Sequence, residues 1–413
     1  MKKKYLFIIA VLSPVILFSQ NSSQWRGERR DGHYNETGLL KVWPANGPQL
    51  LWSYEGLGAG YTSVAIANGK IYVTGMTDDN LTLYVFDIKG KLLNKKVVGK
   101  ERTAQYPGPR CTVVVNDGML YIGNSVGQFY CLDEATLNEV WKKELFQDFD
   151  GRHVGWGWVE SPLIVGEKIF LTPGGIKDNM VALNKKTGAL IWSSPGKGTP
   201  SSYCSPMYIS DQRVPIVATW MASARGGRGS PNDNELVAFN AETGDVLWSI
   251  ILPSENNINP NTPIYSDGLI FASTGYSGGS WLLRLKDGGK TVEQVWHNVA
   301  DNCHHGPVKV GDYVYTTAHN NSRGFYCIDW KTGETKYREA NYPQSSMICA
   351  DGMLYVYSDN GNMNLVKPNP DKYELVSSFK ITLGTDHHWA HPVIHQGVLY
   401  IRHGDALMAY KVK

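Results

Sequence analysis

The sequence predicts an all-β fold, an eight-bladed β-propeller closed by pairing of the N-terminal strand with the C-terminal blade. A short phrase recurs eight times: a Ser or Thr, four or five mostly apolar residues, a Gly-centred turn, and then an aliphatic–aromatic pair. The copies are 40 to 57 residues apart, the length of one four-stranded propeller blade. The last copy lacks an outer strand, and the start of the chain supplies one. The copies end at Tyr72, Tyr121, Phe170, Val214 (a degenerate copy), Phe271, Tyr315, Tyr355 and Tyr400.

The first twenty residues have the composition of a secretory signal peptide. Three lysines precede an apolar run that ends in small residues. This run is too short to favour a permanent membrane span. We expect a signal peptide at 1–20, an N-terminal arm at 21–42 and one propeller domain at 43–413. The protein would then be periplasmic or secreted.

Charge and cysteine spacing exclude several classes of partner. Removal of the three lysines takes the formal charge from +2 to about −1, which argues against nonspecific binding to nucleic acid or membranes. We expect no nucleic-acid partner, no membrane insertion and a monomer. The six cysteines show no CxxC spacing. Pairing of Cys303 with Cys327 and burial as small apolar side chains both remain open.

The third copy illustrates how one blade is read. Its sequence predicts an inner strand at 161–165, a second at 168–172, a third at 180–184 and an outer strand at 189–193. The turn before the outer strand contains Thr-Gly, and the outer strand carries a Trp. Both features recur in other copies. We expect these tryptophans to pack between neighbouring blades.

The last copy ends after its third strand. The segment "GPQLLWSYEG" near the N-terminus carries Trp52 where the repeat expects the outer-strand Trp. We therefore expect this segment to complete the eighth blade and to join the two ends of the ring, which leaves no exposed sheet edge at the closure.

The repeat resembles the PQQ-like (quinoprotein-type) β-propeller family over nearly all of the mature chain. The recurring "G-x-x-Y" and "TG…W" phrases and the opening "WRGERRDG" carry this resemblance. The family includes quinone-dependent alcohol dehydrogenases and an outer-membrane assembly scaffold. The resemblance implies that a dehydrogenase would have adjacent cysteines and a calcium site of Glu, Asn and Asp. This chain has no adjacent cysteines and no matching calcium set, so we expect no quinone cofactor.

The loops before the inner strand and between strands two and three of such a blade open on one face. Residues at these positions should therefore ring the mouth of the central channel, and they differ from blade to blade, as in an asymmetric ligand site. We expect one axial pocket with a rim of three further residues. The pocket set is Tyr61, Arg110, Glu160, Tyr203, Asn261, His304, His305 and His391; the rim set is Arg152, His153 and Trp389.

Histidine, tyrosine and arginine beside aromatic rings favour an enzyme that acts on acidic sugars. The predicted reaction is β-elimination, by a lyase or dehydratase, on uronic-acid-containing oligosaccharides, by analogy with propeller-fold polysaccharide lyases. Arg110 would hold the sugar carboxylate. Tyr203 or His304 would take the C5 proton, and His305 or His391 would protonate the leaving oxygen. The substrate-binding set would be Tyr61, Glu160, Asn261, Arg152, His153 and Trp389.

Two alternatives remain open at this point. One is a non-catalytic periplasmic binding or assembly scaffold, against which stands the absence of a lipoprotein cysteine near the signal peptide. The other is a quinone-dependent dehydrogenase. The sequence predicts no cofactor; a divalent metal held by the histidines is left open, because no closely spaced ligand motif demands one.

Overall fold

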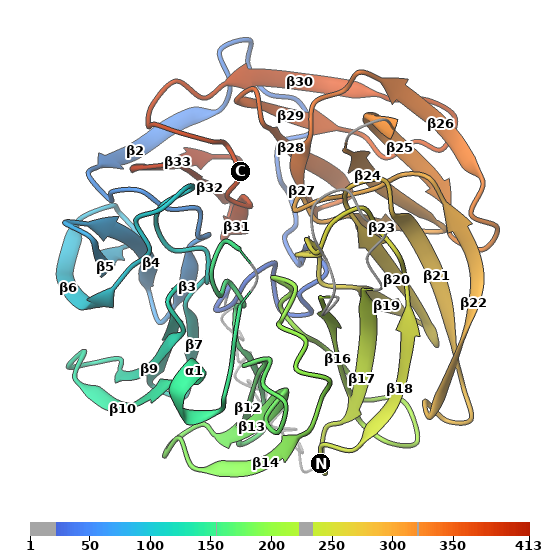
Figure 1. Ribbon diagram of the computed structural model, residues 1–413. Helices are drawn as coiled ribbons and strands as arrows, with labels where there is room; N and C mark the ends of the chain where they lie inside the picture. The colour runs from blue at the N-terminus through green and yellow to red at the C-terminus, as the bar shows by residue number, and fades with distance from the viewer. Residues whose placement is uncertain (1–21, 154, 223–233, 320–321) are drawn as a thin grey trace, which may run out of the picture.

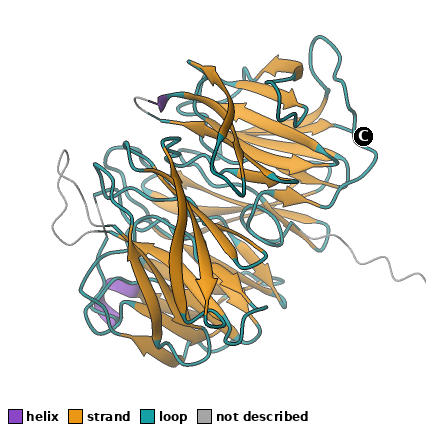
Figure 2. Cartoon of the chain, turned by 90° about the vertical axis from the view of Figure 1, so that its right-hand side faces the viewer, coloured by secondary structure: helices purple, strands orange, loops and turns teal. Residues whose placement is uncertain are grey.

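The computed structural model describes residues 22–153, 155–222, 234–319 and 322–413. The predicted signal peptide lies outside these residues. Eight small sheets surround one axis, which confirms the predicted eight-bladed propeller (Figure 1). Strands dominate the side view as well (Figure 2), and the α-helix that accompanies them is α1 (Leu145–Asp148). No helix among the described residues is both long and apolar enough to cross a membrane.

Each blade has four antiparallel strands, ordered from the axis outward. The first four blades consist of β3 (Ala65–Ala67), β4 (Lys70–Thr77), β5 (Asn80–Asp87) and β6 (Leu92–Lys100); β7 (Val114–Asn116), β8 (Met119–Gly123), β9 (Gln128–Asp133) and β10 (Glu139–Glu144); β11 (Leu163–Val165), β12 (Lys168–Leu171), β13 (Met180–Asn184) and β14 (Leu190–Ser194); and β15 (Met207–Ile209), β16 (Ile216–Met221), β17 (Glu235–Asn240) and β18 (Val246–Ile251).

The next four blades follow the same plan. They consist of β19 (Ile264–Ser266), β20 (Leu269–Thr274), β21 (Gly279–Lys286) and β22 (Thr291–Asn298); β23 (Val308–Val310), β24 (Tyr313–Ala318), β25 (Gly324–Asp329) and β26 (Thr335–Ala340); β27 (Ser345–Ala350), β28 (Met353–Ser358), β29 (Asn362–Val366) and β30 (Leu375–Lys380); and β31 (Val393–His395), β32 (Val398–His403), β33 (Ala406–Lys411) and β2 (Gln49–Glu55).

The repeat phrase corresponds to the hairpin of the two innermost strands. In the third blade Leu163 pairs with Phe170, the residue that ends its copy. The equivalent pair in the fourth blade is Met207 with Ala218. The fourth copy therefore ends at Ala218, and its assignment to Val214 was wrong by four residues, because the turn between β15 and β16 is longer than in the other blades.

The N-terminal strand closes the ring as predicted. β2 pairs antiparallel with β33, so the eighth blade combines both ends of the chain. Trp52 lies on β2, and its indole Nε1 donates to the carbonyl of Ile88 in the first blade at 3.2 Å. An added Cβ at Gly90, in a turn with φ of 84°, would lie 2.4 Å from the Trp52 ring.

The same contact joins other neighbouring blades. The outer-strand tryptophans Trp141, Trp192 and Trp296 each donate through Nε1 to a backbone carbonyl of the following blade. Each ring also lies against the glycine of the next Thr-Gly turn, where a Cβ would come within 2.6 to 2.8 Å of it. The prediction that these tryptophans pack between blades is confirmed, and the contact explains why the turn requires glycine.

The Ser and Thr residues that open the copies link the inner strands near the axis. The amide of Thr112 donates to Ser161 Oγ at 3.0 Å. The amide of Ser161 in turn donates to Ser205 Oγ at 2.9 Å. Each of these two hydroxyls therefore accepts a hydrogen bond from the backbone of the preceding blade. The Ser and Thr residues that open the copies thus have a structural role near the axis.

The N-terminal arm crosses the channel of the ring. Figure 1 shows this blue segment near the centre. Its short strand β1 (His33–Tyr34) pairs in parallel with β27 of the seventh blade. Arg30 donates to the carbonyls of Ser161 and Pro162 in the third blade. The arm thus contacts blades on opposite sides of the axis and forms the floor of the channel.

Apolar clusters fill the interfaces between successive blades. All six cysteines are buried and unpaired. The alternative of a Cys303–Cys327 disulfide is therefore not realised, and the cysteines pack as small apolar side chains.

Candidate functional site

A pocket of about 340 Å³ lies on the axis of the propeller, at the face where the loops before the inner strands end. Aromatic rings form most of its wall. They come from seven different segments of the chain, so the ring of blades brings together residues far apart in sequence. The aromatic residues of the wall are Trp25, Tyr61, Tyr106, Trp156, Tyr203, Tyr276 and Trp389.

Trp389 is at the centre of this wall. The exposed His387 ring stacks on it with centroids 4.2 Å apart and planes 6° apart. Tyr61 and Tyr106 contact it with centroids 5.1 and 5.2 Å away, and His304 meets it edge-on at 4.8 Å. Rings in contact hold one another in place and present flat apolar faces with few rotatable bonds.

Arg110 fixes the loops that carry two of these aromatic residues. Its Nη1 donates to the carbonyl of Trp156 at 2.6 Å, and its Nη2 donates to the carbonyl of Tyr106. Its guanidinium also lies 5.8 Å from the centre of the Tyr61 ring. Burial lowers the pKa of Arg110. Both terminal nitrogens therefore have partners in the protein itself.

The two tyrosine hydroxyls of the predicted set are also engaged. Tyr61 Oη donates to Asp386 Oδ2 at 2.6 Å, and burial together with this carboxylate raises its pKa. Tyr203 Oη accepts the amide of Trp156 at 3.0 Å, and burial raises the pKa of Tyr203. Neither hydroxyl is prepared to lose a proton at neutral pH.

The floor of the pocket is built by the N-terminal arm. Trp25 lies edge-on against His391 with centroids 5.3 Å apart. Arg26 Nη1 donates to His391 Nδ1 at 3.3 Å, and Arg26 Nη2 donates to the carbonyl of Pro307 at 2.6 Å. Because arginine cannot accept, Nδ1 of His391 carries no proton and Nε2 donates to the carbonyl of His304 at 3.2 Å. Burial, followed by the charge of Arg26, holds the pKa of His391 well below its usual value.

Glu160 and Asn261 lie behind the pocket wall. Glu160 is fully buried, and its Oε2 accepts the amide of Thr172 at 3.1 Å. Burial raises the pKa of Glu160 to about 8, although the charge of Arg30 opposes the shift. The side chain of Asn261 donates to the carbonyl of Asn302 and accepts the amide of Gly306. Both residues organise loops of the channel and have no face toward the pocket.

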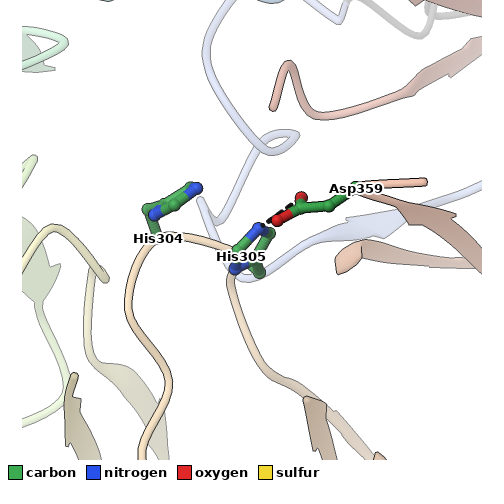
Figure 3. A group of neighbouring side chains, drawn as sticks. All are labelled: His304, His305 and Asp359. Atoms are coloured by element: carbon green, nitrogen blue, oxygen red, sulfur yellow. Dashed lines mark hydrogen bonds and ion pairs between the residues drawn. The ribbon is translucent and has the colours of Figure 1, made fainter. Parts of the chain in front are cut away.

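Two histidines and one aspartate gather at the wall formed by blades six and seven (Figure 3). His304 and His305 lie on the loop before β23, and Asp359 lies between β28 and β29. His305 Nε2 is 2.9 Å from Asp359 Oδ1. The rings of His304 and His305 have centroids 3.9 Å apart. Burial, followed by the nearby His305, holds the pKa of His304 well below its usual value.

The structure brings together part of the predicted set. Six of its members line the pocket: Tyr61, Arg110, Tyr203, His304, His391 and Trp389. His305 is adjacent to the pocket through Asp359, whereas Glu160 and Asn261 support it from behind. Arg152 and His153 are not among the lining residues. The His153 ring lies tilted beside Phe146 with centroids 5.3 Å apart, and its backbone forms an isolated parallel β-bridge with Ser201.

Sequence reasoning missed Trp25 and Asp359 as pocket residues. Asp359 was within reach, because it lies in a loop between strands two and three, which opens on the pocket face. Trp25 was not, because the repeat gives no information about an arm that lies outside it.

Fold and site together define a PQQ-like propeller with an aromatic axial pocket. A family model described as "Outer membrane protein assembly factor BamB" matches residues 90–201 and 153–369. These matches extend over more than half of the chain, and the protein belongs to this family.

Curated relatives fall into two groups. The outer membrane protein assembly factor BamB of Shewanella oneidensis is 22% identical over 270 residues, 62% of each chain. The quinoprotein alcohol dehydrogenase PedH of Pseudomonas putida is 24% identical over 144 residues, 34% of this chain and 22% of that protein. The matched region thus spans less than two thirds of these relatives.

Solved structures show the same fold. BamB from Moraxella catarrhalis has a TM-score of 0.63 at 12% identity, covering 88% of this chain and 99% of that one. The quinohemoprotein alcohol dehydrogenase of Comamonas testosteroni has a TM-score of 0.69 at 12% identity, covering 95% of this chain and 80% of that one.

The prediction of a lyase or dehydratase was wrong, and so was that of an acidic oligosaccharide as partner. The family and its relatives are an assembly factor and quinoprotein dehydrogenases. The geometry agrees with this correction. Arg110, assigned to the sugar carboxylate, already binds two carbonyls. His391, assigned as proton donor, is neutral and binds a carbonyl through its only N–H.

Proposed function

We propose that this chain is an exported, non-catalytic binding scaffold whose channel mouth holds a segment of a protein partner in the periplasm. One observation carries the proposal: the polar groups of Arg110, Tyr61, Tyr203 and His391 bind other groups of the same chain. The surface offered to a partner is therefore mainly aromatic. Aromatic side chains around a preformed pocket are typical of the few residues that dominate protein–protein affinity.

The family supports the nature of the partner. The family model is described as an outer membrane protein assembly factor. The structural likeness to BamB from Moraxella catarrhalis covers 99% of that chain. A partner engaged in outer-membrane protein assembly is thus part of the proposal. Export across the inner membrane is required for such a role, in agreement with the basic and apolar N-terminus.

The alternative of a quinone-dependent dehydrogenase is weaker on the residues present. Pyrroloquinoline quinone is a planar tricarboxylate and needs cationic or N–H donors toward the pocket. The arginines at the axis donate to carbonyls of the chain itself: Arg26, Arg30, Arg110 and Arg402. We propose that the pocket does not hold this cofactor.

A deletion strain tests the proposed function. Loss of the gene should lower the content of β-barrel proteins in the outer membrane, and the wild-type gene should restore it. The double variant Tyr106→Ala/Trp156→Ala should restore little, because two rings of the pocket wall are gone. Leu190→Ala/Val246→Ala, which shortens two half-exposed side chains on the outer strands β14 and β18 away from the pocket, should restore fully. Full rescue by the first variant, or dye reduction that depends on added quinone, would refute the proposal.

A further inference from the structure

The cluster of His304, His305 and Asp359 has no role in the proposed function. One ligand atom from each of the three side chains lies within 4.8 Å of the other two. In Figure 3 the His304 ring points toward the pair formed by His305 and Asp359. The neighbouring blades six and seven both contribute to the cluster, so it depends on the packing between them.

The burial of these histidines costs free energy where a ring nitrogen has no hydrogen-bond partner. His305 is fully buried. His304 Nε2 is also buried, and among the described residues it has no hydrogen-bond partner. A buried polar atom without a partner costs about 1–3 kcal/mol, and such atoms are rare in native proteins. A positive ion placed between the imidazole nitrogen and the carboxylate would satisfy them together.

The backbone that carries the two histidines is held in place. The amide of His305 donates to Asn302 Oδ1 at 3.0 Å, and the amide of Gly306 donates to Asn261 Oδ1 at 3.0 Å. Gly306 has a φ of 62°, and an added Cβ there would lie 1.5 Å from Arg26 Nη1. Rigid support of this kind is what keeps ligands at the positions a metal requires.

The ligand types indicate the class of ion. Two imidazole nitrogens and one carboxylate oxygen suit zinc, iron and their neighbours, whereas calcium and magnesium prefer oxygen alone. Zinc bonds of about 2.1 Å place tetrahedral ligands roughly 3.3 Å apart. Side-chain rotations that move ligand atoms by about 1 Å would bring the observed group to this geometry.

We propose that His304, His305 and Asp359 form a three-ligand site for a divalent transition metal at the wall of the axial pocket. The remaining coordination position faces the pocket and accepts water or a donor group of a bound partner. The site does not depend on the identity of that partner, so it stands or falls separately from the scaffold function.

Zinc binding to the full mature chain, prepared without a polyhistidine tag and stripped with a chelator, tests the site. We expect one zinc ion per chain by calorimetry and elemental analysis. His304→Ala and Asp359→Asn should each weaken binding by about 10-fold or more. Cobalt should give a visible absorption band of a four- or five-coordinate ion in the wild type that both variants lose.

Two controls separate a metal site from a structural hydrogen bond. Asp359→Asn keeps an oxygen that can accept from His305, so the metal-free variant should melt near the wild type. His297→Ala removes an exposed histidine on β22 and should bind zinc as the wild type does. The proposal is overturned if the stripped wild type binds no zinc, or if His304→Ala and Asp359→Asn bind it as tightly as His297→Ala.

Discussion

The indole Nε1 of Trp52 donates to the carbonyl of Ile88 at 3.2 Å, and this bond ties the last blade of the propeller to the first. The ring of Trp52 also packs near Phe86 and Tyr400, with centroids 6.3 and 6.0 Å away. Because β2 unites the two chain ends, we expect the stability of the whole ring to depend on this contact.

Trp52→Ala should lower the free energy of unfolding by about 2–4 kcal/mol, since it removes a large, partly buried ring at the closure. Leu51 on the same strand is 44% exposed, and Leu51→Ala should cost about 0.5 kcal/mol or less. Urea unfolding of both variants measures the difference. Equal losses would mean that the closure does not depend on the indole.

Gly188 in a Thr-Gly turn and Gly69 in the turn between β3 and β4 form a matched pair of glycines. Gly188 and Gly69 both have positive φ, 68° and 73°. A Cβ at Gly188 would lie 2.8 Å from Trp141, whereas one at Gly69 would meet no atom within 4 Å. Both Ala variants carry the backbone cost of about 1 kcal/mol. Gly188→Ala should be destabilised by a further 1–3 kcal/mol; similar melting of the two variants would contradict the proposed packing between blades.

Glu160 should make stability depend on pH. Its pKa in the folded protein is raised to about 8 by burial, from 4.5. The folded state therefore binds more protons than the unfolded state between these values, and stability falls as pH rises through this window. Between about pH 6 and about pH 9 the wild type should lose about 2–3 kcal/mol more than Glu160→Gln does. Parallel melting curves for the two proteins would show that Glu160 is ionised throughout.

Arg110 should keep the loops of Tyr106 and Trp156 ordered without being needed for the fold. Arg110→Ala removes the donors to the carbonyls of Tyr106 and Trp156. Amide hydrogen exchange around these two residues should accelerate by about 10-fold or more, while the inner strands keep their protection. Arg110→Lys should rescue only in part, because lysine cannot hold two carbonyls in a fixed fork. Unchanged amide exchange around Tyr106 and Trp156 in Arg110→Ala would show that Arg110 does not order these loops.

The repeat in the sequence was sufficient to predict the blades, the closing strand and the interblade tryptophans. These features follow from apolar alternation and turn residues, which act locally. The site was predicted less well. Alignment of the eight copies placed Tyr61, Arg110 and His304 at the mouth of the channel. The alignment cannot show whether a polar side chain there binds the backbone of a neighbouring loop. The commitment of Arg110 to two carbonyls is a tertiary feature, and it reverses the function inferred from the residue types alone.

The arm shows the same limit. Trp25 and Arg26 precede the first blade, so no periodicity relates them to the ring. Arg26 nevertheless contacts the carbonyl of Pro307 and the ring of His391, residues nearly three hundred or more positions away along the chain. Only closure of the ring around the arm brings these groups together.

The most direct test of the scaffold function is photocrosslinking in cells of the host. A photoreactive phenylalanine analogue replaces Tyr106 or Trp156 at the channel mouth, or Tyr265 beside a turn of the opposite face as the control. The account predicts adducts with a protein of the outer-membrane assembly process at the first two positions and none at the third. Absence of adducts at Tyr106 and Trp156, or equal adducts at Tyr265, would contradict it.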